Sequence, residues 1–512
     1  MLIDELLREI EAGPKGPKVG AFFDFDGTLI SGYSAGAFYQ DRVRRREFSA
    51  GELARTVLAG AEMAVRGSDV TKLMGVAISS WAGRSEEEVT ELFGRLFHER
   101  IAGMVYPEAR ELVRAHQRAG HTVALATSAT RYQAAPLAED LGIEHVLCSE
   151  VELVQGSFSG FVAGEVLWGE AKARAVKRFA RRRRVGLARS YAYANGDEDV
   201  AFLEVVGNPR PLNPASGLER VARERSWPVS RFTSRGRPGL TSVVRTGAAL
   251  AGLGAAGGVG LAVGALNRSR RQAANVATSI GPDLALALAG VELRVTGTEH
   301  LWSHRPAVFI FNHQSSIDVP VIGSLVRRDL TGVAKKELGH DPRFALIGYV
   351  VDVAYVDRAD RAQARAALEP AVEKLRSGIS IAIAPEGTRS ATPRLGRFKK
   401  GAFHLAIQGG VPIVPIVIRN AGDVMWRGSF LIRPGTIDVA VLDPIDTGDW
   451  KVGELDERIA AVRERYVDVL EHWPRRAGGS AAGEGFRVEV GSGGVAGPEA
   501  IGRRPTPPPR ER

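Results

Sequence analysis

Apolar runs and helical stretches alternate along the first part of the chain. The runs VGAFFDF (residues 19–25) and HTVALAT (residues 121–127) have the length and composition of buried strands. Strands that alternate with helical stretches are typical of a parallel sheet covered by helices. A long helical insert, at about residues 31–105, separates the two strands. The pattern predicts an α/β domain at residues 1–222 that carries a helical insert.

A second stretch of the same kind covers residues 283–472. Its apolar strand PAVFIF (residues 306–311) precedes a loop and a helix that begins near Ser315. The residues between the two stretches, 223–282, begin rich in Arg, Ser and Pro, which indicates a linker. Residues 473–512 contain GGSAAGEG and PTPPPRER, a composition typical of a disordered tail. The chain is therefore expected to hold two α/β domains.

One uncharged run within the predicted linker is long enough to cross a bilayer. Residues 246–266 read TGAALAGLGAAGGVGLAVGAL and have arginines on both sides. Four leucines and two valines favour insertion only modestly, and seven glycines oppose helix formation. The pairs Gly254/Gly258 and Gly260/Gly264 have the spacing that lets helices pack closely in lipid. We expect a membrane-associated segment, with a flexible linker or a buried soluble helix as alternatives.

Composition narrows the set of partners. The only cysteine is Cys148, so a disulfide framework is not expected, and the acidic, weakly apolar start gives no sign of a cleaved signal peptide. A net charge of +9 suits anionic lipid or phosphorylated substrates. Basic residues are not interleaved with aromatic ones in the way that nucleic-acid binding needs, so no nucleic-acid partner is expected. The protein is expected to face the cytoplasm, and the oligomeric state stays unknown.

Four polar motifs occur in order in the first domain. Asp24 and Asp26 follow the first strand in FFDFDGTLI, Thr127 ends the second, Lys172 lies in WGEAKARAV, and NGDED occupies residues 195–199. Two acids two positions apart at the carboxyl end of a strand can hold a cation and attack an electrophile. The set resembles the haloacid dehalogenase superfamily of phosphohydrolases, in the phosphoserine phosphatase-like branch with a helical cap.

The resemblance implies a role for each of these residues. Asp24 would be the nucleophile that forms an aspartyl-phosphate, and Asp26 would protonate the leaving alkoxide. Thr127 and Lys172 would hold the phosphate oxygens, and Lys172 would keep Asp24 ionised. A Mg²⁺ ion would be bound at the positions Asp24, Asp26, Asn195 and Asp199. The implied fold is Rossmann-like, and residues 31–105 would form the cap.

The chain departs from this pattern at two positions. Asn195 stands where the family usually has a metal-binding aspartate, so Mg²⁺ affinity should be lower unless Asp197 substitutes. Tyr33 stands where phosphoserine phosphatases have a glutamate for the substrate ammonium, so phosphoserine is a poor candidate substrate. A non-catalytic regulatory domain stays open as an alternative.

A second ordered set lies in the other α/β stretch. NHQSSID, at residues 312–318, places His313 five positions before Asp318, and VAKKEL, AYVDR and APEGTRS follow. The set closely resembles the glycerolipid acyltransferases that acylate lysophosphatidic acid. By that resemblance His313 would take the proton of the acceptor hydroxyl as it attacks a thioester, and Asp318 would fix the tautomer of His313.

Cations in the same set could hold the phosphate of the acceptor. Arg389 offers a planar fork in a Gly-containing turn, and Lys335 and Arg358 add further positive charge. Glu386 is expected to orient the turn rather than react. The predicted substrate-binding positions in this domain are Lys335, Arg358, Glu386, Gly387, Thr388 and Arg389.

The two resemblances together imply a bifunctional lipid enzyme at the cytoplasmic face of the cell membrane. The C-terminal domain would convert lysophosphatidic acid to phosphatidic acid, with acyl-CoA or an acyl carrier protein thioester as donor. The N-terminal domain would release phosphate from a phosphorylated lipid or related ester with Mg²⁺. A membrane-remodelling scaffold without turnover is a further alternative, which the complete His313/Asp318 and Arg389 sets do not favour.

Overall fold

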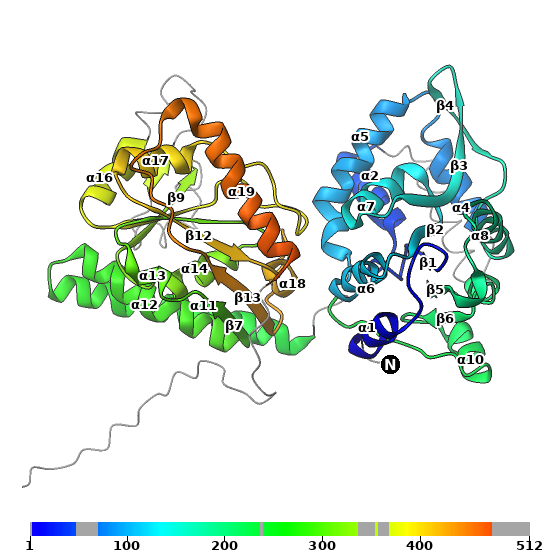
Figure 1. The fold of residues 1–512 in the computed structure, drawn as a ribbon, viewed down its shortest axis with the longest axis horizontal. Helices are drawn as coiled ribbons and strands as arrows, with labels where there is room; N and C mark the ends of the chain where they lie inside the picture. The colour runs from blue at the N-terminus through cyan, green and yellow to red at the C-terminus, as the bar shows by residue number, and fades with distance from the viewer. Residues whose placement is uncertain (1–2, 48–69, 236–238, 336–353, 357–367, 474–512) are drawn as a thin grey trace, which may run out of the picture. The chain divides into compact units, whose positions relative to one another are not determined.

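The computed structural model describes residues 3–47, 70–235, 239–335, 354–356 and 368–473. The predicted disordered tail, beyond residue 473, and Arg358 lie outside these residues. Figure 1 shows two mixed α/β sheets with helices on their faces, so the predicted fold class is confirmed. Each of the two domains is described by itself.

The N-terminal domain has a six-stranded sheet with the order β4-β3-β2-β1-β5-β6. All neighbours are parallel except β3 and β4, which form an antiparallel hairpin. The strands are β1 (Gly20–Phe23), β2 (Thr122–Thr130), β3 (His145–Val154), β4 (Ser157–Ala163), β5 (Tyr191–Ala194) and β6 (Asn208–Pro211). Phe23 packs into the core on one face of β1 and Phe22 into the core on the other, as a central parallel strand requires.

Helices cover both faces of this sheet. They are α1 (Ile3–Ala12), α6 (Pro107–Arg118), α7 (Arg131–Leu141), α8 (Glu170–Arg183), η3 (Leu187–Arg189), η4 (Asp197–Asp199), α9 (Val200–Leu203) and α10 (Ser216–Glu224). The insert between β1 and β2 contains α2 (Ser34–Arg45), α4 (Val70–Ser79), α5 (Glu86–Leu96), η1 (Phe97–Ile101) and η2 (Ala102–Met104). Phe38, Trp81 and Phe93 form an aromatic core inside this insert, so these apolar side chains stabilise the cap.

The C-terminal domain has a seven-stranded sheet with the order β10-β9-β11-β8-β12-β13-β7. Among these neighbours only β12 and β13 are antiparallel. The strands are β7 (Val291–Thr296), β8 (Val308–Phe311), β9 (Leu330–Lys335), β10 (Ala354–Val356), β11 (Ser380–Ile383), β12 (Ile413–Ile418) and β13 (Gly435–Val441). The central strands β8, β11 and β12 are buried along their whole length.

Two layers of helices enclose the second sheet. The helices are α11 (Leu240–Leu266), α12 (Arg270–Ala289), α13 (His300–Ser303), α14 (Asp318–Val326), α16 (Glu369–Arg376), α17 (Gly401–Gly409), α18 (Ala421–Val424), η7 (Val452–Glu454) and α19 (Leu455–Glu471). Side chains of α11, α12 and α14 share a core with Phe309 and Phe311. Those of α16, α17 and α19 share a core with Val308 and Ile310, on the opposite face of β8.

The predicted linker is largely structured. Its first residues extend the N-terminal domain, since Phe232 is buried in that core and its amide donates to the Asn213 side chain at 2.7 Å. A later part belongs to the C-terminal domain, because Ala249 of α11 lies in the core beneath β8. The Arg-, Ser- and Pro-rich composition of this region gave no sign of these apolar contacts.

The uncharged run 246–266 lies in α11, which pairs with α12 (Figure 1). A Cβ atom on Gly260 would lie 2.6 Å from the Ala273 carbonyl oxygen, and one on Gly264 would lie 2.5 Å from the Ala273 Cβ. The two backbones therefore touch along a stripe of small residues, as the Gly260/Gly264 spacing suggested. The other pair, Gly254 and Gly258, faces open space.

The opposite side of α11 is apolar and exposed. Large exposed side chains on this helix are Leu240, Val243, Val244, Leu250, Val259, Leu261 and Leu266. By length and composition α11 could cross a membrane, and no other helix of the described residues meets that test. The same test is met by core helices of soluble proteins, so it supports membrane contact only weakly.

A buried chain of hydrogen bonds joins α6 to β5 in the N-terminal domain. The Tyr193 hydroxyl lies 2.8 Å from His116 Nε2, His116 Nδ1 lies 2.8 Å from His121 Nδ1, and His121 Nε2 lies 2.8 Å from the Pro14 carbonyl oxygen. A carbonyl oxygen only accepts, so His121 donates through Nε2 and accepts through Nδ1. His116 then donates through Nδ1 and accepts from Tyr193. With both imidazoles neutral, every link of this chain has one donor and one acceptor.

The helix pair generates a first prediction. Gly260→Ala should lower the free energy of unfolding of the C-terminal domain by about 1–3 kcal/mol, because the new Cβ meets backbone that cannot move freely. Gly254→Ala is the matched control and should raise it slightly, since that position is open and Ala is the better helix former. Hydrogen exchange of the α11 amides measures both. Equal effects at the two positions would contradict the tight packing.

The histidine chain generates a second prediction, on pH. Burial lowers the pKa of His116 well below its usual value, and burial also lowers the pKa of His121. Below about pH 6.5 the unfolded chain therefore binds more protons than the folded one, so stability should fall as the pH drops through that value. Hydrogen exchange of β5 amides between pH 7.5 and 5.5 should show this fall, and His116→Gln should make it shallower. An unchanged slope in that variant would rule out the histidine pair as its cause.

Candidate active sites

The two polar motifs of the C-terminal domain meet at one edge of its sheet. Strands β8 and β11 are parallel neighbours, with Val308 paired to Ile381 and Ile310 paired to Ile383. Their carboxyl ends therefore lie side by side, and the chain leaves β8 through residues 312–318 and β11 through residues 384–390. Parallel pairing brings together two segments that are more than seventy residues apart.

His313 and Asp318 form a hydrogen-bonded pair in this loop. His313 Nδ1 lies 2.8 Å from Asp318 Oδ2, and the same oxygen accepts the backbone amides of Gln314 and Ser315 at 2.8 Å each. Asp318 is fully buried in the first turn of α14, whereas His313 is partly exposed. A carboxylate only accepts, so the pair holds the proton on Nδ1 and leaves the Nε2 lone pair of His313 for a proton from a substrate.

Asn312 sets the direction in which this loop leaves the sheet. Its Oδ1 accepts the Ile418 amide at 2.7 Å, and its Nδ2 donates to the Ile418 carbonyl at 2.7 Å. The backbone N–H and C=O of Ile418, in β12, thus pair with the Asn312 side chain instead of with the backbone of a longer β8. The backbone is released at this point, and the next residue, His313, can turn out of the sheet. Sequence reasoning assigned no role to Asn312.

Glu386 ties the second motif to the first. Its Oε1 accepts the His313 amide at 2.9 Å, and its Oε2 accepts the Ser390 hydroxyl at 2.7 Å and the Gly396 amide at 2.8 Å. The Ser390 amide in turn donates to the His313 carbonyl at 2.7 Å. Both backbone polar groups of His313 are therefore held by the segment that follows β11. The buried Glu386 carboxylate thus holds the His313 backbone and the turn in place, which is an orienting role.

The Arg389 side chain also contacts the loop that contains His313. Its Nη1 donates to the Ser316 hydroxyl at 2.6 Å, and the side chain is only partly buried. The turn that carries it depends on Gly387, whose φ of +74° is a left-handed conformation that favours glycine, and the next residue, Thr388, is exposed. Lys335 ends β9, two strands from β8 in the same sheet. Arg389 is thus close enough to the loop of His313 to bind a phosphate on the same small substrate.

The N-terminal site is built on the same principle. β1 lies between β2 and β5, so Asp24 and Asp26 after β1, Thr127 near the end of β2 and Asn195 after β5 share one edge of the sheet. Thr127 is buried, and its hydroxyl accepts the Ala129 amide at 3.0 Å. The four motifs are brought together as the sequence predicted.

Lys172 connects the carboxylates of this site. Its Nζ donates to Asp24 at 2.9 Å and to Asp199 at 2.6 Å, and all three side chains are buried. Burial alone would lower the pKa of Lys172, but the charges of Asp199 and Asp24 outweigh it and raise that pKa. Burial raises the pKa of Asp199, and Lys172 opposes that shift. Lys172 therefore stays charged and holds Asp24 and Asp199 in place through two ion pairs.

Asp26 has a different environment. It accepts the Ser34 amide at 2.6 Å and the Ser34 hydroxyl at 3.1 Å, so the first turn of α2 holds it in place. Burial raises the pKa of Asp26 to about 7, and the Ser34 hydrogen bonds oppose the shift. Two carboxyl groups two positions apart therefore have different surroundings, since Asp24 pairs with Lys172 and Asp26 with Ser34.

The donor atoms of this site fit Mg²⁺ in type. The Thr28 hydroxyl lies 3.2 Å from Asp24 Oδ2 and 3.0 Å from Asn195 Oδ1, so these two oxygens face a common point. Carboxylate, amide and backbone carbonyl oxygens are the ligands that Mg²⁺ prefers. In the part of the chain that the structure describes, no three His, Cys, Asp or Glu side chains are grouped to hold a metal. The Asn195 amide oxygen would add a ligand without charge.

The other two acids of NGDED are used differently. Asp197 is exposed, and its Oδ1 accepts the Leu218 amide at 2.6 Å in the first turn of α10. Asp197 therefore does not substitute for a carboxylate at position 195. Glu198 is partly buried at the site, where burial raises its pKa. Sequence reasoning did not single out Glu198.

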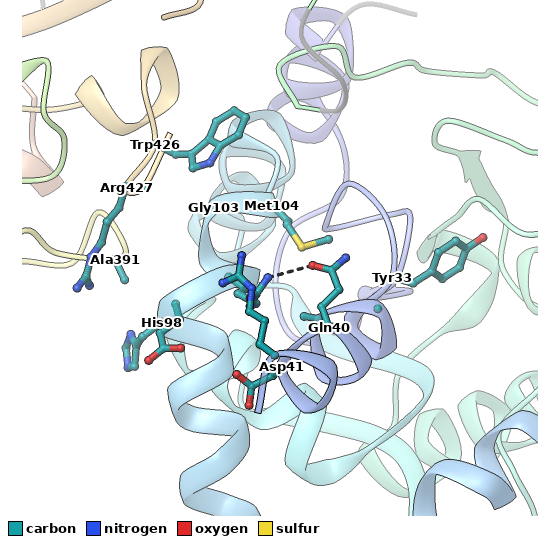
Figure 2. A pocket seen from close by; sticks show the side chains of 15 residues that line it. Tyr33, Gln40, Asp41, His98, Gly103, Met104, Ala391, Trp426 and Arg427 are labelled. Carbon is teal, nitrogen blue, oxygen red and sulfur yellow. Dashed lines mark hydrogen bonds between the residues drawn. The ribbon is translucent and has the colours of Figure 1, made fainter. Parts of the chain in front are cut away.

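The cap contributes Tyr33 and α2 to the surroundings of this site. Tyr33 directly precedes α2 and is mostly exposed. Desolvation, followed by the charges of Glu198, Asp26 and Asp24, raises the pKa of Tyr33. Gln40 of α2, labelled in Figure 2, accepts a hydrogen bond from Arg100 at 3.0 Å. No carboxylate stands at position 33 to bind an ammonium group.

Comparison with known proteins separates the chain into the same two parts. Residues 21–204 match the haloacid dehalogenase-like hydrolases, and residues 292–419 match a family described as acyltransferases. Phosphoserine phosphatase SerB1 of Mycobacterium tuberculosis is 35% identical over 254 residues, which are 49% of this chain and 81% of that protein.

Two relatives match the C-terminal part. The 1-acyl-sn-glycerol-3-phosphate acyltransferase of Limnanthes alba is 36% identical over 188 residues, which are 36% of this chain and 65% of that protein. The chain thus covers slightly less than two thirds of this relative. The uncharacterized acyltransferase C1851.02 of Schizosaccharomyces pombe is 36% identical over 197 residues, which are 37% of this chain and 70% of that protein.

The hydrogen bonds of Glu386 generate a third prediction. Glu386→Gln should loosen the loop of His313, because an amide nitrogen would face a donor where a carboxylate oxygen now accepts one. We expect faster hydrogen exchange of the His313 and Ser390 amides, by about tenfold or more, with β12 unaffected. Glu369→Gln, on the exposed start of α16, is the control. Unchanged exchange at His313 would contradict the positioning role.

Proposed function

The chain belongs to the haloacid dehalogenase-like hydrolases through residues 21–204 and to the acyltransferases through residues 292–419, and from this premise we propose a bifunctional lipid enzyme. The C-terminal domain acylates lysophosphatidic acid to phosphatidic acid with an acyl thioester. The N-terminal domain releases phosphate from a phosphorylated lipid or related ester with Mg²⁺. The Limnanthes relative supports the first activity by its name.

The observation that carries the proposal is the His313–Asp318 pair with its free Nε2. His313 Nε2 takes the proton of the acceptor hydroxyl while the hydroxyl oxygen attacks the thioester carbonyl carbon. The carbon–sulfur bond then breaks, and the imidazolium returns the proton to the leaving thiolate. Asp318 stabilises the imidazolium between these steps, and a base of this kind contributes about 10²- to 10⁴-fold in rate.

Recognition of the acceptor is assigned to Arg389. Its guanidinium is anchored to Ser316, in the loop that begins with His313, so a phosphate bound by Arg389 would hold the acceptor hydroxyl near Nε2. Lys335 and Arg358 are proposed as additional cations, and Gly387 and Thr388 as backbone contacts in the same turn. The acyl donor is a thioester of CoA or of acyl carrier protein.

The N-terminal reaction uses the two aspartates in turn. An Asp24 oxygen attacks phosphorus, the bond to the leaving oxygen breaks, and Asp26 gives its proton to that oxygen. Asp26 then accepts a proton from the water that hydrolyses the aspartyl-phosphate. Thr127 and Lys172 bind the phosphate oxygens. The residues that would hold Mg²⁺ are Asp24, Asp26 through its carbonyl, and Asn195, and the ion would neutralise charge on the phosphate.

The exposed side of α11 supports a position at the membrane. Its exposed leucines and valines form an apolar face, and an apolar, exposed face of a helix pair suits the boundary of a bilayer. We propose that this surface holds the C-terminal domain at the cytoplasmic face of the cell membrane, where its lipid substrates lie.

A non-catalytic N-terminal domain is the second candidate. Asn195 in place of an anionic ligand favours it, because weaker Mg²⁺ binding would reduce or abolish turnover. In that case the domain would bind a phosphate ester without hydrolysing it and would regulate the C-terminal reaction.

Acylation of lysophosphatidate by the purified chain tests the first activity. His313→Ala should lower kcat by about 10²-fold or more, because no comparable proton acceptor is left, while the unfolding temperature stays within a few degrees. His304→Ala, at an exposed histidine before β8, is the matched control. Loss of less than tenfold in His313→Ala would reject the assigned base.

Release of phosphate from phosphate monoesters tests the second activity. Asp24→Asn should abolish Mg²⁺-dependent release, since an amide cannot form the aspartyl-phosphate, and acylation should continue. Phosphoserine should be a poor substrate relative to glycerol phosphates or phosphorylated lipids. No release from any monoester by the unmodified chain, together with altered acylation in Asp24→Asn, would favour the regulatory domain.

A further inference from the structure

The amino ends of the strands in the N-terminal sheet form one edge, opposite the edge that carries Asp24. Strands β1, β2, β3 and β5 are parallel, so the segments that lead into them lie side by side. The Gly16 amide donates to the Ala119 carbonyl at 2.9 Å, and the Gly186 amide donates to the Lys18 carbonyl at 2.8 Å. These segments, residues 13–19, 118–121, 142–144 and 181–190, therefore form one surface, which we call the amino edge.

The amino edge is strongly positive. The segments contain one acidic residue, Glu144, which precedes β3. Against it stand eight exposed cations, which are Lys15, Lys18, Arg118, Arg181, Arg182, Arg183, Arg184 and Arg189. They come from all the segments except the one before β3, so parallel pairing gathers onto one surface cations that are far apart in the chain.

The cations of the amino edge have no carboxylate partner among the described residues. Arg174, earlier in α8, pairs with Glu165, whereas the arginines at the end of that helix form no ion pair in the described ranges. Cations in the last turn of α8 are favoured by the helix dipole, but Lys15 and Lys18 lie in a loop and gain nothing from it. Like charges this close repel one another in the folded domain. An anionic partner would remove that repulsion.

The amino edge suits a broad anionic layer rather than one bound phosphate. The ends of α6 and α8 at this edge are carboxyl ends, which present carbonyl oxygens and not the amides that hold a phosphate. The cations are also spread over several segments instead of converging on one point. The segments contain no Phe, Tyr or Trp that could stack on a nucleic-acid base. These features favour a lipid surface over a nucleotide or a nucleic acid.

The order of the chain also favours a bilayer. The N-terminal domain precedes α11 directly, and the exposed apolar side of α11 is the surface that we place at the membrane. A domain joined to a membrane-bound segment meets that membrane at a high effective concentration. Each Lys or Arg near an anionic bilayer then strengthens binding by roughly fivefold.

We propose that the amino edge binds the head groups of anionic phospholipids and holds the N-terminal domain against the bilayer. The Asp24 site lies at the opposite end of β1, so a domain bound in this way leaves its site uncovered. The binding needs neither of the proposed reactions. The choice of a bilayer rests on the proposed membrane position of α11.

Co-sedimentation of the full chain with vesicles tests the proposal. Vesicles of phosphatidylcholine alone are compared with vesicles that also contain about 30% phosphatidylglycerol, at low and at high salt. Lys18→Gln/Arg184→Gln should lower the affinity for the anionic vesicles by about 10- to 30-fold at low salt, and it should leave the affinity for neutral vesicles unchanged. High salt should reduce the difference between the two chains.

Two further variants control for structure. Arg44→Gln/Arg46→Gln removes the same charge from exposed residues at the end of α2, and Arg46, like Arg184, follows its helix in a left-handed conformation. This variant should bind anionic vesicles as the unmodified chain does. Lys18→Arg/Arg184→Lys keeps the charge and should also bind normally. The unfolding temperature of each variant shows that it is folded.

The outcomes separate this proposal from the others. Equal affinity of the unmodified chain for neutral and anionic vesicles would overturn it, as would an equal loss in Arg44→Gln/Arg46→Gln or a loss in the charge-preserving variant. Tighter binding of a DNA duplex than of anionic vesicles at the same salt would assign the amino edge to nucleic acid and overturn it as well. Absence of binding to neutral vesicles, with the expected binding to anionic ones, would reject the membrane position of α11 alone.

Discussion

Parallel pairing of neighbouring strands is the constraint on which both sites depend. In each domain a strand that carries the reactive residue lies between parallel neighbours, β1 between β2 and β5, and β8 between β11 and β12. The carboxyl ends of such strands meet at one edge, and the loops that leave them can combine residues from distant parts of the chain. The backbone hydrogen bonds of the sheet thus position His313 and Asp24 before any side chain contributes.

Side-chain hydrogen bonds then refine this position in two ways. In the C-terminal site, the buried Glu386 and Asn312 hold backbone groups, so the loop of His313 has little freedom to rotate. In the N-terminal site, the buried Lys172 holds two carboxylates by charge. The first arrangement orients the loop of His313 through hydrogen bonds to its backbone. The second fixes Asp24 and Asp199 through ion pairs with one buried ammonium group.

The glycines of α11 let one side of the helix pack closely against α12 while the other side stays exposed. Gly260 and Gly264 allow the backbone of α12 to approach, and the leucines and valines on the other side stay exposed. Because the small residues bury little apolar area, α11 is held by close backbone contact with α12 and by the few side chains that reach the core beneath β8. The exposed apolar side of α11 is then available to contact another apolar surface.

The sequence by itself determined the two domains, the catalytic pairs and the order of the motifs, because these depend on local periodicity and on residues close in the chain. His313 and Asp318 are five positions apart, and a strand followed by a loop and a helix brings them together wherever the domain lies. The helix α11 of the predicted linker has contacts with distant residues, such as those of Ala249 in the core beneath β8, which composition could not indicate.

Only the tertiary structure decided which polar residues support the sites. Glu386 reaches His313 across 73 positions and Asn312 reaches Ile418 across 106, and no local pattern reports contacts of that separation. Asp197 and Glu198 are adjacent acids that the sequence cannot distinguish. The fold assigns the first to the amide of Leu218 and partly buries the second over Gly196, because consecutive residues in a tight turn point their side chains in different directions.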